Sequence, residues 1–365
     1  MTSENPGENL RHHGDRDMAP GMVDFAVNVW LPAPPRWLRD RLPAPPRWLR
    51  DRLPAPPRWL RDRLAGALER LAAYPSDEDD LAAREAVARR HGRSADEVMV
   101  LNGSAEGFAL LPNLRPSLAA VVHPSFTEPE VALRTAGIPV HRVMLDGDYV
   151  LRPELVPAEA DMVVIGNPTN PTSVTHPAAL IRQLAAPGRV VVVDEAFMDA
   201  IPGEPESLAG DPGVLVLRSL TKTWALAGLR AGYVLGSAGT LARLAVDRPQ
   251  WPVGTLVLEA VTACCAPGAV AEAEAAARTV VEYREVFVAA LRDAGIEVVA
   301  APTAPFVLVR VEDGLRVRAA LRAKKIAVRR GETFPGLTAD HIRLAVRPPA
   351  QASQLLQAWP VEVGS

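Results

Sequence analysis

Cysteine is almost missing from this chain. The sequence has two cysteines, Cys264 and Cys265, and they are neighbours in an alanine-rich segment. Two adjacent cysteines cannot form a disulfide framework, so we expect a reducing, cytoplasmic environment. A redox-active pair is the alternative, but we expect two small buried thiols on a helix.

Other features are equally scarce. No apolar run approaches the length of a membrane span, and the first residues, MTSENPGENLRHHGDRD, lack the apolar core of a signal peptide. Lysine and arginine (40) nearly balance aspartate and glutamate (43), so nothing favours nucleic acid or an anionic membrane as partner. The cysteines and the seven histidines show no metal-ligand spacing. We therefore expect a globular protein without a metal site.

The chain has the length and composition of a folded protein with a sizeable core. It has 365 residues, of which 48% are apolar and 23% charged. This length suits a large domain with a second, smaller one. Apolar runs that alternate with helical segments predict an α/β fold with a mainly parallel sheet, because β-branched runs such as VVVV suit strands buried on both faces.

Several of these runs end at a polar or glycine-bearing loop. They are EVMVLNGSAEGFALL, SLAAVVHPSF, ADMVVIGNPTNPT, GRVVVVDEAF and GVLVLRSLTKT. Ligands of open α/β sheets bind beyond the carboxyl ends of the strands. We therefore expect the polar loops to form one site.

An 11-residue segment, LPAPPRWLRDR, occurs three times without change, starting at Leu31, Leu42 and Leu53. Its prolines forbid a continuous helical coiled coil, and the unit is too short for a solenoid. A recent duplication in a surface loop is the simpler interpretation. Only the last copy continues into RLAGALERLAAYP, which has the spacing of an amphipathic helix. We expect it to dock, leaving Trp37 and Trp48 partly exposed.

The stretch SLTKTWALAGLRAGY places Lys222 among apolar residues, with Arg230 as the next cation. A lysine in a dry pocket loses its proton more easily and becomes an amine nucleophile, as Schiff-base chemistry requires. Ser219 and Lys222 also spell S-x-x-K, a serine-nucleophile signature. Its companion motifs S-D-N and K-T-G are absent, so we set the serine-nucleophile hypothesis aside.

The other loop ends carry groups that suit a flat, anionic cofactor. Gly103, Ser104 and Ala105 begin a helix, where free N–H groups favour a phosphate. Phe126 offers an aromatic face, although a core aromatic is the equal alternative. Asn170 has an uncharged side chain that can donate a hydrogen bond. Asp194 ends a buried strand, where an acid either caps a turn or pairs with a buried cation such as a pyridinium.

In this order the motifs N-G-S-A-E-G, P-S-F, N-P-T-N-P-T, D-E-A-F and S-L-T-K-x7-R resemble the pyridoxal-phosphate enzymes of the class I/II aminotransferase fold (fold type I). The resemblance covers residues 74 to 347. It implies that Lys222 carries pyridoxal 5'-phosphate as a Schiff base. The other implied contacts are Asp194 to the pyridine nitrogen, Asn170 to the ring hydroxyl, Phe126 on the ring, and Gly103, Ser104, Ala105, Ser219 and Arg230 at the phosphate. Tyr74 would reach the neighbouring subunit's cofactor, which implies a homodimer.

Further matches refine the resemblance. Many histidinol-phosphate aminotransferases have tyrosine where this chain has Phe197. The string DEAFMDAIP…VLRSLTKTWALAGLRAGY is more similar to the L-threonine-O-3-phosphate decarboxylases of cobalamin biosynthesis. The resemblance to these decarboxylases implies substrate contacts by His13, Gly14, Asn28, Asn170, Arg329 and Arg343, the last two in R-x4-F-P-G-L-x5-R.

The resemblance favours decarboxylation of L-threonine-O-3-phosphate and leaves two alternatives. Transamination of a histidinol-phosphate-like substrate uses the same residues, since the reaction depends on which substrate bond stands perpendicular to the cofactor ring. A non-catalytic, effector-binding version of the fold is the other alternative. It normally accompanies a DNA-binding domain, which the proline-rich residues before Tyr74 cannot supply.

The domain organisation follows from these assignments. We expect an N-terminal arm with a substrate-contacting loop at 1–30 and the exposed triple repeat at 31–63. The large cofactor-binding domain is expected at 64–250. A small C-terminal domain of helices and short strands is expected at 251–365.

Overall fold

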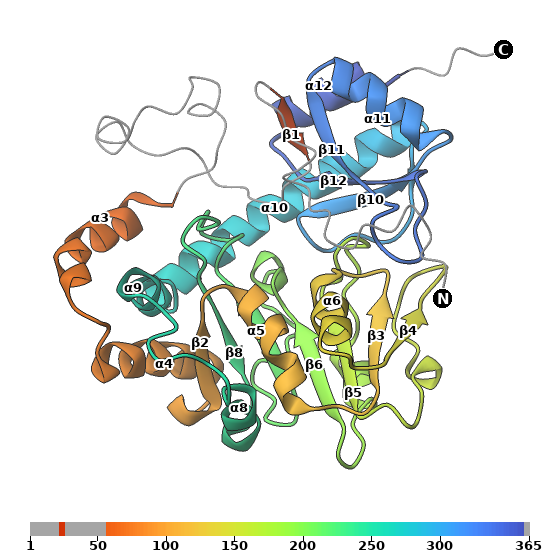
Figure 1. The fold of residues 1–365 in the computed structure, drawn as a ribbon. Helices are drawn as coiled ribbons and strands as arrows, with labels where there is room; N and C mark the ends of the chain where they lie inside the picture. The colour runs from red at the N-terminus through yellow and green to blue at the C-terminus, as the bar shows by residue number, and fades with distance from the viewer. Residues whose placement is uncertain (1–21, 26–55, 361–365) are drawn as a thin grey trace.

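The computed structural model of the protein describes residues 22–25 and 56–360 (Figure 1). Two sheets divide these residues into a large domain around seven strands and a small domain around five. His13, Gly14 and Asn28, three of the predicted substrate contacts, lie outside the described residues, as do the first two copies of the repeat. The structure has the α/β fold that the sequence predicts.

The sheet of the large domain has the strand order β2-β8-β7-β6-β5-β3-β4. Its strands are β2 (Val98–Leu101), β3 (Ala119–His123), β4 (Val140–Met144), β5 (Met162–Gly166), β6 (Val190–Asp194), β7 (Leu215–Ser219) and β8 (Gly232–Leu235). The pairs among β3 to β7 are parallel, and β8 runs antiparallel to both of its neighbours. The five apolar runs chosen from the sequence all contain strands, and β4 and β8 complete the sheet.

Burial on both faces explains the apolar character of the central strands. Val191, Val192 and Val193 of β6 are almost entirely inaccessible to solvent. Helices cover both faces, so each side of these strands packs on apolar side chains. The polar residue Asp194 ends β6 and lies beside Gly166 of β5 in the parallel register. Polar residues such as Asp194 therefore lie at the carboxyl ends of the parallel strands.

The small domain contains a mostly antiparallel sheet with the order β1-β11-β12-β10-β9. Its strands are β1 (Val23–Phe25), β9 (Glu297–Val298), β10 (Phe306–Arg310), β11 (Ile326–Arg330) and β12 (His341–Ala345). The edge strand β1 comes from the N-terminal part of the chain and pairs parallel to β11. The sequence analysis did not identify this strand.

Helices connect and cover the strands. The α-helices are α3 (Arg58–Gly66), α4 (Asp77–His91), α5 (Ser104–Leu110), α6 (Glu128–Thr135), α7 (Ala178–Arg182), α8 (Ala238–Leu244), α9 (Thr255–Cys264), α10 (Pro267–Asp293), α11 (Gly314–Ala323) and α12 (Pro349–Ala358). Short 3-10 helices are η2 (Leu68–Ala72), η3 (Ala95–Glu97), η4 (Leu111–Leu114), η5 (Pro153–Leu155) and η6 (Met198–Ala200). Helix α10, cyan in Figure 1, runs from the large domain to the small domain.

The third copy of the repeat forms α3, as the sequence predicts. Leu60 is fully buried, and the Trp59 indole packs edge-on against Trp224 at 5.5 Å between centroids. The Trp59 Nε1 atom also donates a hydrogen bond to Glu272 at 2.8 Å. These contacts fix the helix on the large domain.

The prediction that an amphipathic α-helix continues beyond this copy is wrong after Gly66. The α-helix ends at Gly66, a residue with low helix propensity, and continues as the 3-10 helix η2. Leu68 and Leu71 are each 53% exposed instead of facing the core. The predicted apolar stripe is therefore surface in a single chain.

The two cysteines are free and buried, as expected. Burial raises the pKa of both thiols, which keeps them protonated and unreactive. Among the described residues no single helix has the length and apolar composition of a membrane span, although α9 and α10 pass that test as a pair bent by 72°. The described part of the chain also contains no cluster of three or more potential metal ligands.

Candidate active site

Asp194 lies at the carboxyl end of β6, at the centre of the large sheet. Its Oδ1 atom accepts a hydrogen bond from the Ala196 backbone N–H at 3.1 Å. Burial raises the pKa of Asp194 to about 7, and the neighbouring Glu195 adds to the rise, whereas the Lys222 ammonium opposes it. The carboxylate is therefore placed where a further cation would stabilise its ionised form.

Lys222 follows β7 in a turn that returns to β8. Ser219 ends β7, and its Oγ atom accepts a hydrogen bond from the Thr221 N–H at 3.3 Å. The lysine is partly buried between Thr221 and Thr223, which are both almost inaccessible. Because β6 and β7 are neighbouring parallel strands, Asp194 and Lys222 follow one another at the same edge of the sheet, and the Lys222 charge lowers the pKa of Asp194.

The start of α5 forms a cradle together with Arg230. Gly103 has φ +81°, and a side chain there would place its Cβ 2.9 Å from the Arg230 guanidinium. Gly232, the first residue of β8, lies equally close to the Ser104 N–H, because a Cβ at Gly232 would be 2.8 Å from that nitrogen. The first N–H groups of a helix have no partner within the helix, so together with the Arg230 guanidinium the start of α5 can hold a phosphate.

Phe126 and Asn170 follow the ends of β3 and β5. The Phe126 ring is partly exposed and tilted against Phe108 at 6.0 Å between centroids. The Asn170 Oδ1 atom accepts a hydrogen bond of 2.6 Å from Arg343 of the small domain. Asn170 thus links the two domains at the site.

Arg329 and Arg343 project from the small domain and are 4% and 5% exposed. They are register partners on β11 and β12. The Arg329 guanidinium lies 4.9 Å from the centre of the Phe334 ring, and that of Arg343 lies 5.3 Å from the centre of Phe306. Two buried cations on aromatic faces form a site suited to an anion.

Tyr74 lies on the surface of the described chain. It is 74% exposed and stacks on Trp251 with 4.3 Å between the ring centroids. Within one chain the structure gives Tyr74 an aromatic partner and leaves its other face open. Ala105 of the predicted cradle is also exposed.

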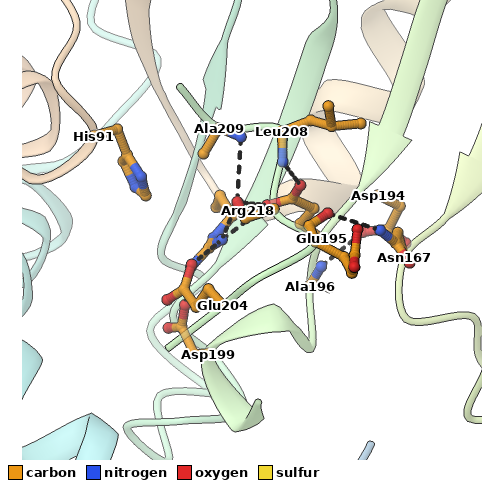
Figure 2. Close-up of polar contacts among 12 residues, drawn as sticks. His91, Asn167, Asp194, Glu195, Ala196, Asp199, Glu204, Leu208, Ala209 and Arg218 are labelled. Carbon is orange, nitrogen blue, oxygen red and sulfur yellow. Dashed lines mark hydrogen bonds and ion pairs between the residues drawn. The ribbon is translucent and has the colours of Figure 1, made fainter. Parts of the chain in front are cut away.

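A buried ion cluster, drawn in Figure 2, lies next to the site and was not predicted from the sequence. Arg218, which precedes Ser219, is 1% exposed and lies 2.8 Å from Glu195 and 2.7 Å from Glu204. It also contacts Asp199, which lies 2.9 Å from Arg90. A charged residue inside an apolar strand, such as Arg218 in VLVLRS, was the available signal.

The charges of this cluster are largely balanced. Although burial alone would raise the pKa of Asp199, Arg90 and Arg218 hold it well below the usual range. Burial and the same two arginines lower the pKa of His91 to about 2, so this histidine is neutral. Buried charges require such partners, because an unpaired one is costly.

The cluster touches the backbone on either side of the predicted cofactor contacts. Glu195 follows Asp194, and Arg218 precedes Ser219. Thr223, which follows Lys222, donates a hydrogen bond from Oγ1 to Asp199 at 3.2 Å. One set of ion pairs therefore fixes three of the segments that carry the site.

The described residues fit pyridoxal phosphate. Burial destabilises the ionised form of Asp194, and a pyridinium nitrogen beside it would supply a cation that stabilises this form. In the cradle, Gly103 has φ +81° beside the Arg230 guanidinium, and the first N–H groups of α5 have no side-chain cap. Lys222, which follows β7 at the same edge of the sheet, is the residue that would bond to the cofactor's aldehyde.

Comparison with known proteins places this site in a family. The family model of aminotransferase class I and II matches residues 49–358. A Mycobacterium tuberculosis protein named histidinol-phosphate aminotransferase is 53% identical over 97% of this chain and 89% of its own length. Threonine-phosphate decarboxylase of Salmonella typhimurium is 30% identical over 80% of this chain and 83% of its own length.

Solved structures show the same fold. Histidinol-phosphate aminotransferase from Clostridium acetobutylicum superposes with a TM-score of 0.77 at 22% identity, covering 84% of this chain and 96% of the other. L-threonine-O-3-phosphate decarboxylase from Porphyromonas gingivalis superposes with a TM-score of 0.76 at 22% identity, covering 92% and 98%. Both kinds of enzyme therefore share the architecture seen here.

Proposed function

Because this chain belongs to the aminotransferase class I and II family, whose enzymes use pyridoxal 5'-phosphate, we propose that it acts on a small phosphorylated amino compound. The pair of buried arginines, Arg329 and Arg343, is the observation that carries the proposal. Two guanidiniums in register beside the cofactor site suit a substrate with two anionic ends.

Each predicted cofactor contact in the large domain has a distinct role in this proposal. Lys222 would hold the cofactor and would move the proton at the substrate carbon that bears the amino group. Asp194 would keep the ring nitrogen protonated, Ser104, Ser219 and Arg230 would hold the phosphate, and Phe126 would contact the ring. When bound, pyridoxal phosphate supplies an electron-withdrawing ring that weakens the bonds of the adjacent substrate carbon.

We favour decarboxylation of L-threonine-O-3-phosphate as the reaction. This substrate carries a phosphate and a carboxylate, so each arginine has an anion to bind. Phe197 supports the choice, because it contributes no hydroxyl near the site and is packed edge-on against Phe306 at 4.9 Å. Asn170 is then the side chain that faces the ring oxygen.

Transamination of histidinol phosphate is the second candidate. The relatives that are 53% identical over almost the whole chain carry the name histidinol-phosphate aminotransferase. In this case one arginine would bind the substrate phosphate, and the carboxylates of the amino-group acceptor would use the same pair in the second half-reaction.

We propose that the protein acts as a homodimer. Tyr74 is 74% exposed, and Leu68 and Leu71, which lie nearby in the sequence, are each 53% exposed. A second copy would cover these side chains and let Tyr74 reach the neighbouring cofactor phosphate.

A single assay separates the two reactions. The purified holoenzyme is incubated with O-phospho-L-threonine, and carbon dioxide and keto-acid formation are both measured. A parallel reaction contains L-histidinol phosphate with 2-oxoglutarate, and glutamate formation is measured. Carbon dioxide release from phosphothreonine supports the favoured reaction, whereas glutamate formation alone supports the second candidate. If neither compound reacts, the proposed substrate class is wrong.

A further inference from the structure

Two segments from different domains are joined by hydrogen bonds next to the candidate active site. The loop after β5 contributes Ser173 and Thr175, and the segment before β10 contributes Thr303 and Ala304. The Ser173 carbonyl accepts from the Thr303 N–H at 2.8 Å and from the Thr303 hydroxyl at 2.7 Å. The hydroxyls of Thr175 and Thr303 lie 2.6 Å apart. We call this contact the 173–304 latch.

The side chain of Ser173 closes the latch. Its Oγ atom accepts a hydrogen bond from the Ala304 N–H at 2.8 Å and donates to the Ala304 carbonyl at 3.4 Å. Both residues are fully buried. The hydroxyl of Ser173 therefore satisfies two backbone groups of the small domain that would otherwise be buried without a partner.

The backbone of Ser173 has a conformation that favours glycine. Its φ angle is +65°, in the left-handed region that side chains with a Cβ rarely adopt. Serine at this position is explained by its hydroxyl, since glycine would adopt the same φ more easily but could not bond Ala304. Residues held in such conformations are concentrated at functional sites.

Both segments of the latch also contact Arg343, the predicted substrate contact. Asn170, three residues before Ser173, accepts the hydrogen bond from Arg343. Phe306, two residues after Ala304, lies under the Arg343 guanidinium. The two segments are thus connected directly by the latch and indirectly through Arg343, which contacts a residue of each.

We infer that Ser173 is a positioning residue, which sets the small domain so that Arg343 faces Asn170 across the substrate site. The inference rests on the proposed function of Arg343 as a substrate contact. Lys222, Asp194 and Arg230 belong to other segments of the large domain, and the hydrogen bonds of the latch described above do not involve them. The latch therefore sets the position of Arg343 relative to Asn170, and we expect loss of the Ser173 hydroxyl to affect substrate binding more than cofactor binding.

The test is the variant Ser173→Gly in the full-length holoenzyme. Glycine keeps the left-handed backbone, so the variant removes the hydroxyl without straining the fold. The matched control is Ser237→Gly, which removes a serine hydroxyl whose two hydrogen bonds, to Thr240, stay within the large domain at the start of α8.

Three quantities are measured on each protein. Hydrogen exchange of the Thr303 and Ala304 amides should become at least tenfold faster in Ser173→Gly. The KM for the compound that the wild type turns over, O-phospho-L-threonine or L-histidinol phosphate, should rise about tenfold while kcat changes less. The Kd for pyridoxal phosphate and the visible absorbance of the bound cofactor should stay within twofold of wild type. Ser237→Gly should alter none of the three.

The outcomes separate the inference from the proposed function. Unchanged amide exchange, or faster exchange with unchanged KM, overturns the role of Ser173. A weakened affinity for pyridoxal phosphate also overturns it, because the effect would then extend to the cofactor side. If the wild type turns over neither compound, the proposed function fails, and the change in KM is replaced by the change in Kd for O-phospho-L-threonine, measured by calorimetry with the same expected tenfold effect.

Discussion

Arg329 and Arg343 stand opposite each other on the antiparallel strands β11 and β12, and each guanidinium lies over a phenylalanine ring. Two like charges at register positions repel each other, and both are almost completely buried. Such a pair suits the binding of anions, because a substrate with two anionic ends would relieve the repulsion.

Arg343→Lys should therefore not behave as a conservative change. A lysine cannot keep both the hydrogen bond to Asn170 and the planar contact with Phe306. We expect kcat/KM to fall about tenfold or more, which corresponds to about 1.4 kcal/mol. Steady-state kinetics on the reactive substrate measure the effect, with Arg310→Lys on the exposed face as control. Wild-type kinetics for Arg343→Lys would show that the substrate does not contact this arginine.

Lys222 should carry the cofactor. Borohydride reduction of the holoenzyme should fix pyridoxal phosphate on a single peptide that contains Lys222. Mass spectrometry of the digested protein identifies the peptide, and Lys222→Ala should give no fixed cofactor. Labelling of Lys324 or Lys325 instead would refute the assignment.

Asp194 should make the stability of the cofactor-free protein depend on pH. Its pKa of about 7 in the folded protein lies above the ordinary value of 3.8. The folded state therefore holds the proton more tightly than the unfolded chain, so this contribution is complete below about pH 4 and is lost as the pH rises through 7. The Tm of the wild type should fall relative to that of Asp194→Asn over this range.

Added pyridoxal phosphate should reduce this loss, because a pyridinium stabilises the ionised carboxylate. Asp194→Asn should still bind the cofactor and lose most turnover. Parallel Tm curves for the two proteins from pH 4 to 8 would mean that the carboxylate is not perturbed by burial.

Arg218→Met should destabilise the protein strongly. The change leaves Glu195 and Asp199 buried with one cation fewer, and breaking a buried ion pair in this way costs about 3–5 kcal/mol. Arg310→Met breaks an ion pair with Glu297 whose side chains are both more than half exposed, so it should cost about 0–1 kcal/mol. Urea unfolding of both variants gives the comparison, and equal losses would contradict it.

Deleting Leu42–Arg63 should preserve the fold. The deletion joins the first copy of the repeat to Leu64, and its sequence is identical to that of the copy that forms α3. The helix, with its buried leucine and the tryptophan on Trp224, can therefore be rebuilt. We expect soluble holoenzyme with a Tm close to that of the full-length protein. Loss of cofactor binding would show that the additional copies have a structural role.

The parts of the fold that depend on local pattern could be predicted from the sequence. The run before Asp194 is β-branched and apolar throughout, which few structures other than a buried strand allow. The order of the motifs predicted one site for Asp194 and Lys222, and the parallel pairing of β6 and β7 brings the ends of their two strands to the same edge of the sheet. The strand and the two motifs could be predicted because each is recognised from a short stretch of sequence.

Features that depend on distant partners could not be predicted. The role of Arg218 requires Glu195, Asp199 and Glu204, which no spacing rule connects to it. The conformation of Ser173 depends on Ala304 in the other domain. The exposure of Leu71 was also missed, because its spacing fits a helix whose apolar side faces the core.

The strand β1 has a consequence for how the protein matures during translation. Val23 pairs with Ile326, so β1 must wait for β11, which is made after all seven strands of the large sheet. The large sheet can therefore form before the edge of the small sheet is complete. An expression product that stops before Ile326 would keep this N-terminal strand without its partner.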